Sequence, residues 1–218
     1  ASVYPADDAF VAGSKLVLSA FLQSPHFLYR TELSTEASGG RVPLSDYEVA
    51  SKLALAVAST MPDAELFASA AAGKLHDKGE VSAQAQRLLA SAKGGLSVDH
   101  LHFQMYRLGT YDGIVRNPQS FPEFTTDTPP AMRAEVLAFL RYVFEQGQGV
   151  SGIFTTPVGF VNSALAPLYG VAGSYGSTLT KVDLDPTQRS GLLTLAGFLS
   201  SSAVVDDPDS IHRGVFVN

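Results

Sequence analysis

Apolar residues recur along most of the chain at intervals of three or four positions, the spacing that gathers them on one face of an α-helix. The clearest example follows Thr128 and two prolines, which are typical of a helix start. The stripe consists of Met132, Val136, Leu140, Val143 and Phe144. We predict an amphipathic helix there, with an ion pair between Arg141 and Glu145 on its polar side.

A second helix start is marked by its capping residues. Ser45 and Glu48 match the S-x-x-E capping box, in which each side chain satisfies a backbone N–H that the helix leaves unpaired. The apolar residues that follow at intervals of four are Val49, Leu53 and Val57. They are the predicted inward face of this helix.

Prolines, glycines and polar caps divide the rest of the chain into short segments. Asp185 and Pro186 predict a buried helix from residue 185 to about 202, and Pro62 suits the first turn of another. The other predicted helices cover residues 7–23, 80–91, 97–108 and 162–169. Residues 113–130 and 147–156 are predicted as irregular, and 179–184 as extended. We therefore predict an all-α, bundle-like array of helices with irregular loops and at most a short β segment.

Composition and charge narrow the classes of partner. The 218 residues carry a formal net charge of -6, and no run of basic residues could neutralise phosphates, so we expect no nucleic-acid partner. No apolar stretch reaches the ~20 residues that a membrane-spanning helix needs. The chain has no cysteine, which excludes disulfides, thiolate ligands and covalent haem attachment through Cys-x-x-Cys-His in this chain.

Two pairs of residues are candidates for cofactor binding. His102 and Met105 lie at i and i+3 of a predicted helix, where they could serve haem or copper, although a histidine packed beside a core methionine explains them more simply. His212 and Arg213 could bind an anion or a cofactor propionate, and the simpler interpretation is a surface or interdomain contact. His100 is too far around the helix from His102 to share a metal, and we predict no metal site.

No complete catalytic motif occurs. The chain lacks the G-x-S-x-G of serine hydrolases and the H-E-x-x-H of zinc proteases, so catalytic residues stay unknown and enzymatic activity uncertain. Residues 147–152 match G-x-G-x-x-G, but they follow a predicted helix, whereas dinucleotide-binding glycines follow a strand. We interpret them as a helix end.

An ordered set of short motifs covers nearly the whole chain. They are Ser24-Pro25-His26-Phe27-Leu28-Tyr29-Arg30, Pro43-Leu44-Ser45-Asp46-Tyr47-Glu48, Met61-Pro62-Asp63-Ala64-Glu65-Leu66, Phe121-Pro122-Glu123-Phe124, Phe160-Val161-Asn162, Leu168-Tyr169-Gly170, Arg189-Ser190-Gly191-Leu192-Leu193-Thr194 and His212-Arg213-Gly214-Val215. In this set the chain resembles the multidomain planctomycete-type cytochrome c family, large bacterial proteins of uncharacterised activity. It departs from the family at Met105, where the family has tryptophan.

The resemblance implies a division into modules. Residues 1–40 would end a preceding helical module, 41–172 would form a central helical module, and 173–218 would begin a cytochrome-like module that stops before its haem motif. It also implies export to the periplasm or cell surface. Haem c would then belong to the missing portion or to a partner chain, and the partners would be the remaining segments of the precursor or a cytochrome.

Two functions from different classes follow. The first is a non-catalytic helical scaffold or interface segment of an exported c-type cytochrome-like protein, related to electron transfer. The second is a stand-alone helical module that binds carbohydrate or a cell-surface partner, with the aromatic residues between Tyr111 and Phe124 as a sugar-facing platform.

Overall fold

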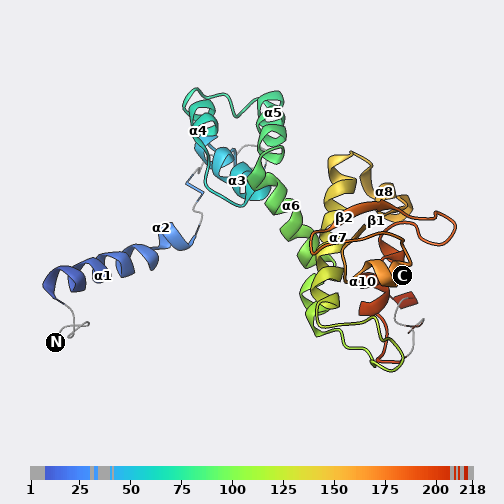
Figure 1. The fold of residues 1–218 in the computed structure, drawn as a ribbon. Helices are drawn as coiled ribbons and strands as arrows, with labels where there is room; N and C mark the ends of the chain where they lie inside the picture. The colour runs from blue at the N-terminus through green and yellow to red at the C-terminus, as the bar shows by residue number, and fades with distance from the viewer. Residues whose placement is uncertain are drawn as a thin grey trace. The chain divides into compact units, whose positions relative to one another are not determined.

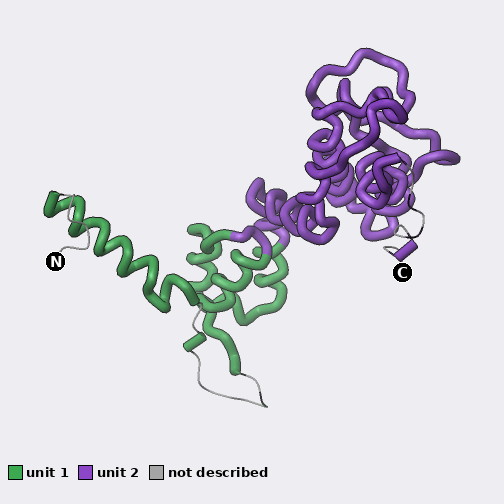
Figure 2. The backbone as a smooth tube through the Cα atoms, turned by 90° about the horizontal axis from the view of Figure 1, so that it is seen from below, with its two compact units in different colours: residues 1–56, 60–85 green, residues 57–59, 86–218 purple. Residues whose placement is uncertain are grey.

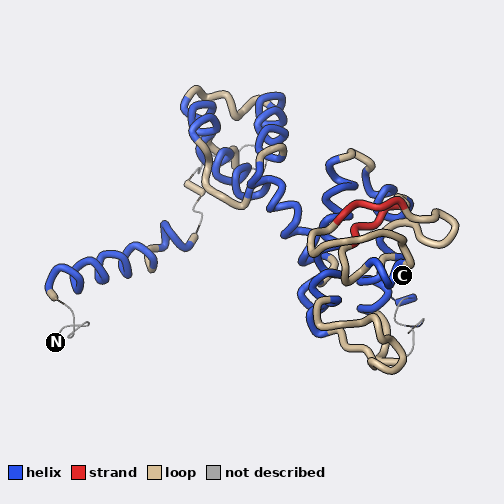
Figure 3. Tube along the Cα trace, viewed as in Figure 1, coloured by secondary structure: helices blue, strands red, loops and turns tan. Residues whose placement is uncertain are grey.

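A computed structural model describes residues 8–29, 32–33, 40, 42–206, 209, 211 and 214–215. The chain divides into two compact units (Figure 2), which are residues 1–56 with 60–85, and residues 57–59 with 86–218. Helices and loops dominate both units, and one two-stranded sheet lies in the second (Figures 1 and 3). The predicted all-α class with a short β segment is confirmed.

The first unit is built from short helices with local caps. They are α1 (Ala9–Leu22), α2 (Pro25–Leu28), most of α3 (Asp46–Ala58), α4 (Ala64–Ala71) and the start of α5 (Lys78–Leu89). The predicted capping box of α3 is confirmed, because the Ser45 amide donates to the Glu48 carboxylate at 2.7 Å. The Asp63 carboxylate caps α4 by accepting from the Leu66 amide at 2.9 Å, so Pro62 precedes the helix instead of lying in its first turn.

The inward face of α3 differs from the prediction. Ala50 and Ala54 are fully buried, whereas Val49, Leu53 and Val57 are only half-buried. The buried line is therefore rotated by one residue, about 100° around the helix axis. Small side chains occupy the closest-packed positions, and the larger apolar residues lie at their edge.

The second unit contains the last turn of α5, then α6 (Ala92–Met105), the 3₁₀ helix η1 (Leu108–Gly113), α7 (Thr128–Glu145) and α8 (Gly149–Thr155). It continues through β1 (Val158–Val161), α9 (Ala166–Tyr169), β2 (Thr180–Asp183), the 3₁₀ helix η2 (Leu192–Thr194) and α10 (Ala196–Ser201). The strands pair antiparallel, with Val158 opposite Asp183 and Val161 opposite Thr180. β2 lies in the segment predicted as extended, and β1 was not predicted.

Three predicted boundaries in this unit are wrong for local reasons. α6 begins at the Ser91 cap and contains Gly94, because a Cβ at residue 94 would lie 2.3 Å from the Leu88 carbonyl oxygen and only glycine permits that approach. The predicted helix 185–202 is confined to η2 and α10, because residues 185–191 form a turn and irregular backbone that ends at Gly191, whose φ of +69° and close approach to the Phe154 backbone exclude a side chain. The predicted loop 147–156 contains α8.

The predicted helix at residue 128 is confirmed as α7, and it forms the centre of the core. Its buried residues include Met132, Val136, Phe139, Leu140 and Val143. They pack with residues from η1, β1, α9, η2 and α10. The core residues contributed from beyond α7 include Leu108, Tyr111, Val161, Leu165, Leu192, Leu195 and Phe198.

Residues on both sides of the predicted module boundary at 172 belong to this one core. Leu165 precedes the boundary and Leu192 follows it, and both are fully buried. The division into modules at residues 40 and 172 stays a prediction from the resemblance. The compact units of the fold are a different division, with boundaries near residues 56 and 85. Within the described ranges, no helix is both long enough and apolar enough to span a bilayer.

Candidate functional site

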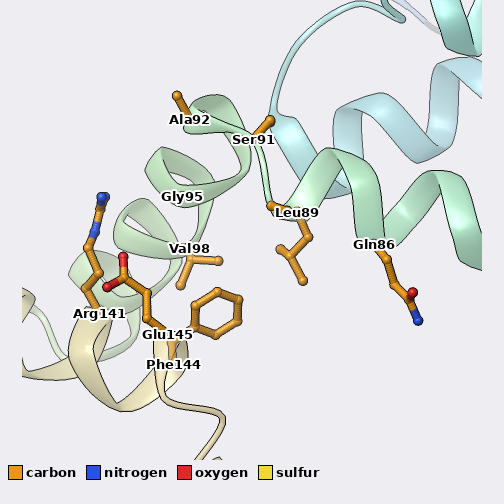
Figure 4. Close-up of a pocket in the computed structure, with 10 residues that line it drawn as sticks. Gln86, Leu89, Ser91, Ala92, Gly95, Val98, Arg141, Phe144 and Glu145 are labelled. Carbon is orange, nitrogen blue, oxygen red and sulfur yellow. The ribbon is translucent and has the colours of Figure 1, made fainter.

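A groove on the second unit runs between the end of α5, the first turns of α6 and the end of α7 (Figure 4). Its volume is about 480 Å³, within the range of ligand-binding clefts. The lining residues are Gln86, Leu89, Ala90, Ser91, Ala92, Gly95, Val98, Arg141, Phe144 and Glu145. Apolar and charged side chains thus share one concave surface.

The apolar part of the groove consists of Leu89, Val98 and Phe144, whose side chains gather at its centre in Figure 4. Leu89 is 36% exposed and Phe144 is 42% exposed. Phe144 was predicted to belong to the inward stripe of α7, and that prediction is wrong. It lies at the end of the helix, where the covering elements of the core no longer reach it.

The charged part of the groove is organised by Arg141. Its Nε donates to Asp99 Oδ1 at 3.0 Å, and its Nη2 donates to Asp99 Oδ2. This two-pronged bond raises the pKa of Arg141, with partial burial opposing the effect and the Glu145 carboxylate adding to it. The predicted pairing of Arg141 with Glu145 is present as an electrostatic interaction, whereas the hydrogen bonds from Nε and Nη2 go to Asp99 on α6.

Gly95 contributes to this arrangement by its lack of a side chain. A Cβ at residue 95 would lie 3.6 to 3.8 Å from Nη1, Cζ and Nη2 of Arg141. Three such similar distances place the flat face of the guanidinium over the glycine. The Arg141 side chain, which extends from α7, is thus held against α6 by its bonds to Asp99 and by its contact with Gly95.

The Glu145 carboxylate is exposed and makes no hydrogen bond or ion pair with any other described residue. Its side chain lies beside that of Arg141 in Figure 4. Arg141 and Glu145 are the charged side chains that line the groove, and Asp99, which is not part of the lining, pairs with Arg141. Because Asp99 compensates the charge of Arg141, the Glu145 carboxylate is the uncompensated charge at the edge of the groove.

A second cavity of about 370 Å³ lies beyond Phe144. It is lined by His102, Leu140, Val143, Phe144, Gly147, Gly149, Val150 and Ile153. Burial lowers the pKa of His102, and Asp99 partly opposes this shift. His102 Nδ1 is buried and has no hydrogen-bond partner in the described part of the chain. A neutral imidazole beside an apolar cavity suits an apolar occupant better than an anion.

The other predicted cofactor residues do not join His102 in this cavity. Met105 is 56% exposed and does not line it. His212 and Arg213 lie outside the described residues. No three or more His, Cys, Asp or Glu side chains within the described ranges are placed to hold one metal ion. The cofactor roles of these four residues stay predictions.

A buried acid occupies the middle of α7, and the sequence interpretation missed it. Glu135 has no exposed surface, although it lies next to Val136 in the apolar stripe. Neither carboxylate oxygen has a hydrogen-bond partner of good geometry among the described residues. Burial raises the pKa of Glu135 to about 8, and the nearby Tyr169 hydroxyl, Arg189 guanidinium and Phe160 backbone only partly oppose the shift.

The neighbours of Glu135 are engaged elsewhere. The Tyr169 hydroxyl accepts a 2.8 Å hydrogen bond from the Ala196 amide, and burial followed by the nearby Glu135 raises the pKa of Tyr169. The Arg189 guanidinium lies 4.6 Å from the Tyr169 ring centroid and donates to the Thr194 carbonyl at 2.8 Å. Glu135 is therefore held as a neutral acid at neutral pH. A single acid interrupting an apolar helical stripe was the only sequence signal for it.

Residues 44–171 match the family described as a protein of unknown function, DUF1592. The chain belongs to this family. No curated protein and no solved structure matches the chain. The DUF1592 match includes every residue that lines the groove, and also Glu135 and Tyr169, whereas Arg189 follows it.

Proposed function

We propose that this DUF1592 chain is a non-catalytic helical scaffold and interface segment of an exported c-type cytochrome-like protein. The groove carries the proposal, because it exposes Leu89 and Phe144 beside a fixed Arg141–Asp99 pair. Exposed aromatic and aliphatic residues next to oriented charges are typical of protein interfaces. The apolar side chains on one side of the groove and the charged side chains on the other would fix the orientation of a bound partner.

The chemistry of the described residues favours binding over catalysis. The acid with the largest pKa change, Glu135, has no exposed surface and cannot reach a substrate in this conformation. The groove contains no serine and histidine pair in contact, and its only nucleophile-type side chain is Ser91, which caps α6 through the Gly94 amide. Binding of a partner in the groove requires no catalytic residue, and it therefore agrees with the side chains that line the groove.

The cytochrome context rests on the ordered motifs of the sequence. Because the chain has no cysteine, haem c would be attached to another segment or to a partner chain. The periplasmic or cell-surface location has the same support. The interface role and the cytochrome context are separable parts of the proposal, and one experiment can report on both.

The test is site-directed photocrosslinking in the native source. A photoreactive phenylalanine analogue replaces Leu89 in the groove, and the matched control replaces Glu123, an exposed residue of the irregular stretch before α7. We expect a defined adduct from position 89 only, with a covalent haem signal in a pyridine haemochrome assay. Equal crosslinking from both positions would refute the interface role. A haem-free adduct from position 89 would refute the cytochrome context alone.

The carbohydrate alternative loses its main residue. Tyr111 is only 2% exposed, and its ring packs in the core against α7 and α10. It cannot stack on a sugar, and Tyr111→Ala would damage the fold instead of removing a binding surface. Phe124 is also partly buried against the same core. Tyr111 and Phe124 therefore serve packing, and Phe121, at 36% exposed, is the aromatic residue of this stretch that stays at the surface.

A further inference from the structure

The groove is negatively charged at one point and apolar beside it. Arg141 has its Nε and Nη2 donors directed at Asp99, so the positive charge of Arg141 is already paired. Glu145 remains as an exposed carboxylate with no described hydrogen-bond partner. Any group that completes the groove electrostatically must therefore bring a positive charge to Glu145.

The surroundings of Glu145 select among positively charged groups. The Phe144 ring, the neighbouring residue on α7, lines the same groove as Leu89 and Val98 (Figure 4). A guanidinium can bind a carboxylate through two parallel hydrogen bonds and can also stack on an aromatic ring. A lysine ammonium is more strongly hydrated and lacks the flat geometry. An arginine therefore suits the combination of Glu145 and Phe144 better.

The small residues of the groove leave room for such a side chain. Ala90, Ser91, Ala92 and Gly95 line the α5–α6 side, and the groove volume is about 480 Å³. An arginine stem can cover the apolar centre while its charged end meets the acid. Apolar residues flanking the arginine in the partner would contact Leu89 and Val98.

Resting on the interface role proposed above, we infer that the groove binds an arginine side chain presented by an apolar segment of a partner protein. Glu145 is the acceptor of the guanidinium, and Phe144 is the surface on which it stacks. The Arg141–Asp99 pair positions the wall of the groove and is not exchanged during binding. Specificity for arginine lies in two adjacent residues at the end of α7.

The test is a titration of the full ¹⁵N-labelled chain with the peptide acetyl-Leu-Arg-Leu-amide, followed by amide chemical shifts. We expect saturable shifts at Leu89, Gly95 and Phe144, and weaker or absent shifts with acetyl-Leu-Gln-Leu-amide. Glu145→Gln should weaken binding about two- to fivefold, because Glu145 is exposed and the change replaces a charge-assisted hydrogen bond with a neutral one. Phe144→Leu should weaken it about threefold, because it removes the stacking face and keeps an apolar side chain.

The matched control is Glu123→Gln, which makes the same chemical change at an exposed acid outside the groove. It should leave the dissociation constant unchanged. Equal weakening by Glu145→Gln and Glu123→Gln would reduce the effect to overall charge and overturn the inference. Saturable shifts at the groove that are the same for the arginine and glutamine peptides would also overturn it.

The outcomes separate this inference from the proposed function. A defined crosslink from position 89, together with no preference for the arginine peptide, would keep the interface role and reject arginine as its partner chemistry. Loss of both the crosslink and the peptide binding would reject both. Arginine-dependent shifts that Glu145→Gln weakens and Glu123→Gln does not would support the inference.

Discussion

Two glutamates on α7 show how differently one helix can use the same side chain. Glu135 lies in the middle of the helix without exposed surface, and burial raises its pKa to about 8. Glu145 is the last residue of the helix and is exposed at the edge of the groove. The first is a neutral acid inside the core at neutral pH, and the second is the exposed acid that we propose binds a partner.

The difference comes from which elements cover each end of α7. η1, β1, α9, η2 and α10 contribute residues to the core around the middle of the helix. Phe144 lines two cavities, and the other residues that line them come from the end of α5, from α6, from α7 and from the region of α8. The buried core therefore surrounds the middle of α7, and the recognition role that we propose belongs to its end.

The largest expected effect compares two phenylalanines of this helix. Phe139→Ala should destabilise the second unit by about 3–5 kcal/mol, because Phe139 is fully buried and its removal leaves a cavity. Phe144→Ala should cost less than about 1 kcal/mol, because its ring is already in contact with water. Native-state hydrogen exchange of the α7 amides measures both values. Similar costs for the two changes would contradict the division of α7 into a core part and a recognition part.

The second prediction concerns the pH dependence of stability at Glu135. Its pKa is raised in the folded state, so the native chain binds the extra proton between about pH 4.5 and pH 8 and the unfolded chain does not. The contribution of Glu135 is therefore fully present below pH 4.5 and is lost as the pH rises towards 8. The loss between pH 5 and pH 8 should be up to about 3 kcal/mol, given about 1.4 kcal/mol per pKa unit.

Denaturant unfolding across this pH range measures that loss, with Glu135→Gln as the comparison. The amide does not titrate, so the stability of this variant should fall less steeply as the pH rises. Glu145→Gln is the control at the other end of the helix, and it should follow the pH profile of the unchanged chain. Parallel profiles for all three proteins would mean that Glu135 does not titrate in this window.

The smallest expected effect belongs to the Arg141–Asp99 pair beside the groove. A double-mutant cycle with Arg141→Gln and Asp99→Asn should give a coupling free energy of about 0.5–1 kcal/mol, because both side chains are partly exposed to water. The coupling should decrease as salt is added. A coupling free energy of about 3 kcal/mol or more would mean that the pair is shielded from water as strongly as the buried middle of α7.

Much of the helical architecture could be predicted, because local signals govern where a helix begins. The Ser45–Glu48 box and the Thr128 start involve groups within one turn, and both occur as predicted. Predictions failed where a close approach of backbone decides. Gly94 is accommodated in α6 because a Cβ there would collide with the nearby Leu88 carbonyl, and Gly191 is required because the Phe154 backbone, far away in sequence, lies against it.

The candidate site was less predictable than the fold. The ion pair of Arg141 was assigned to Glu145 from helical spacing, whereas Asp99, 42 residues away in sequence, takes both hydrogen bonds. The outlying position of Phe144 and the burial of Glu135 depend on which elements cover α7. Helical periodicity identifies the apolar face of a helix, but it does not reveal which part of that face other elements of the fold bury.

The sequence by itself determined the helical class, the central amphipathic helix, the local caps and the absence of cysteine chemistry, because each depends on residue identity or on neighbours within a few positions. Only the tertiary structure decided that α7 is closed around Glu135 and open around Glu145. The physical reason is that burial and charge pairing are set by residues far away in sequence. The same carboxyl group becomes a neutral core acid or an exposed surface acid according to what packs over it.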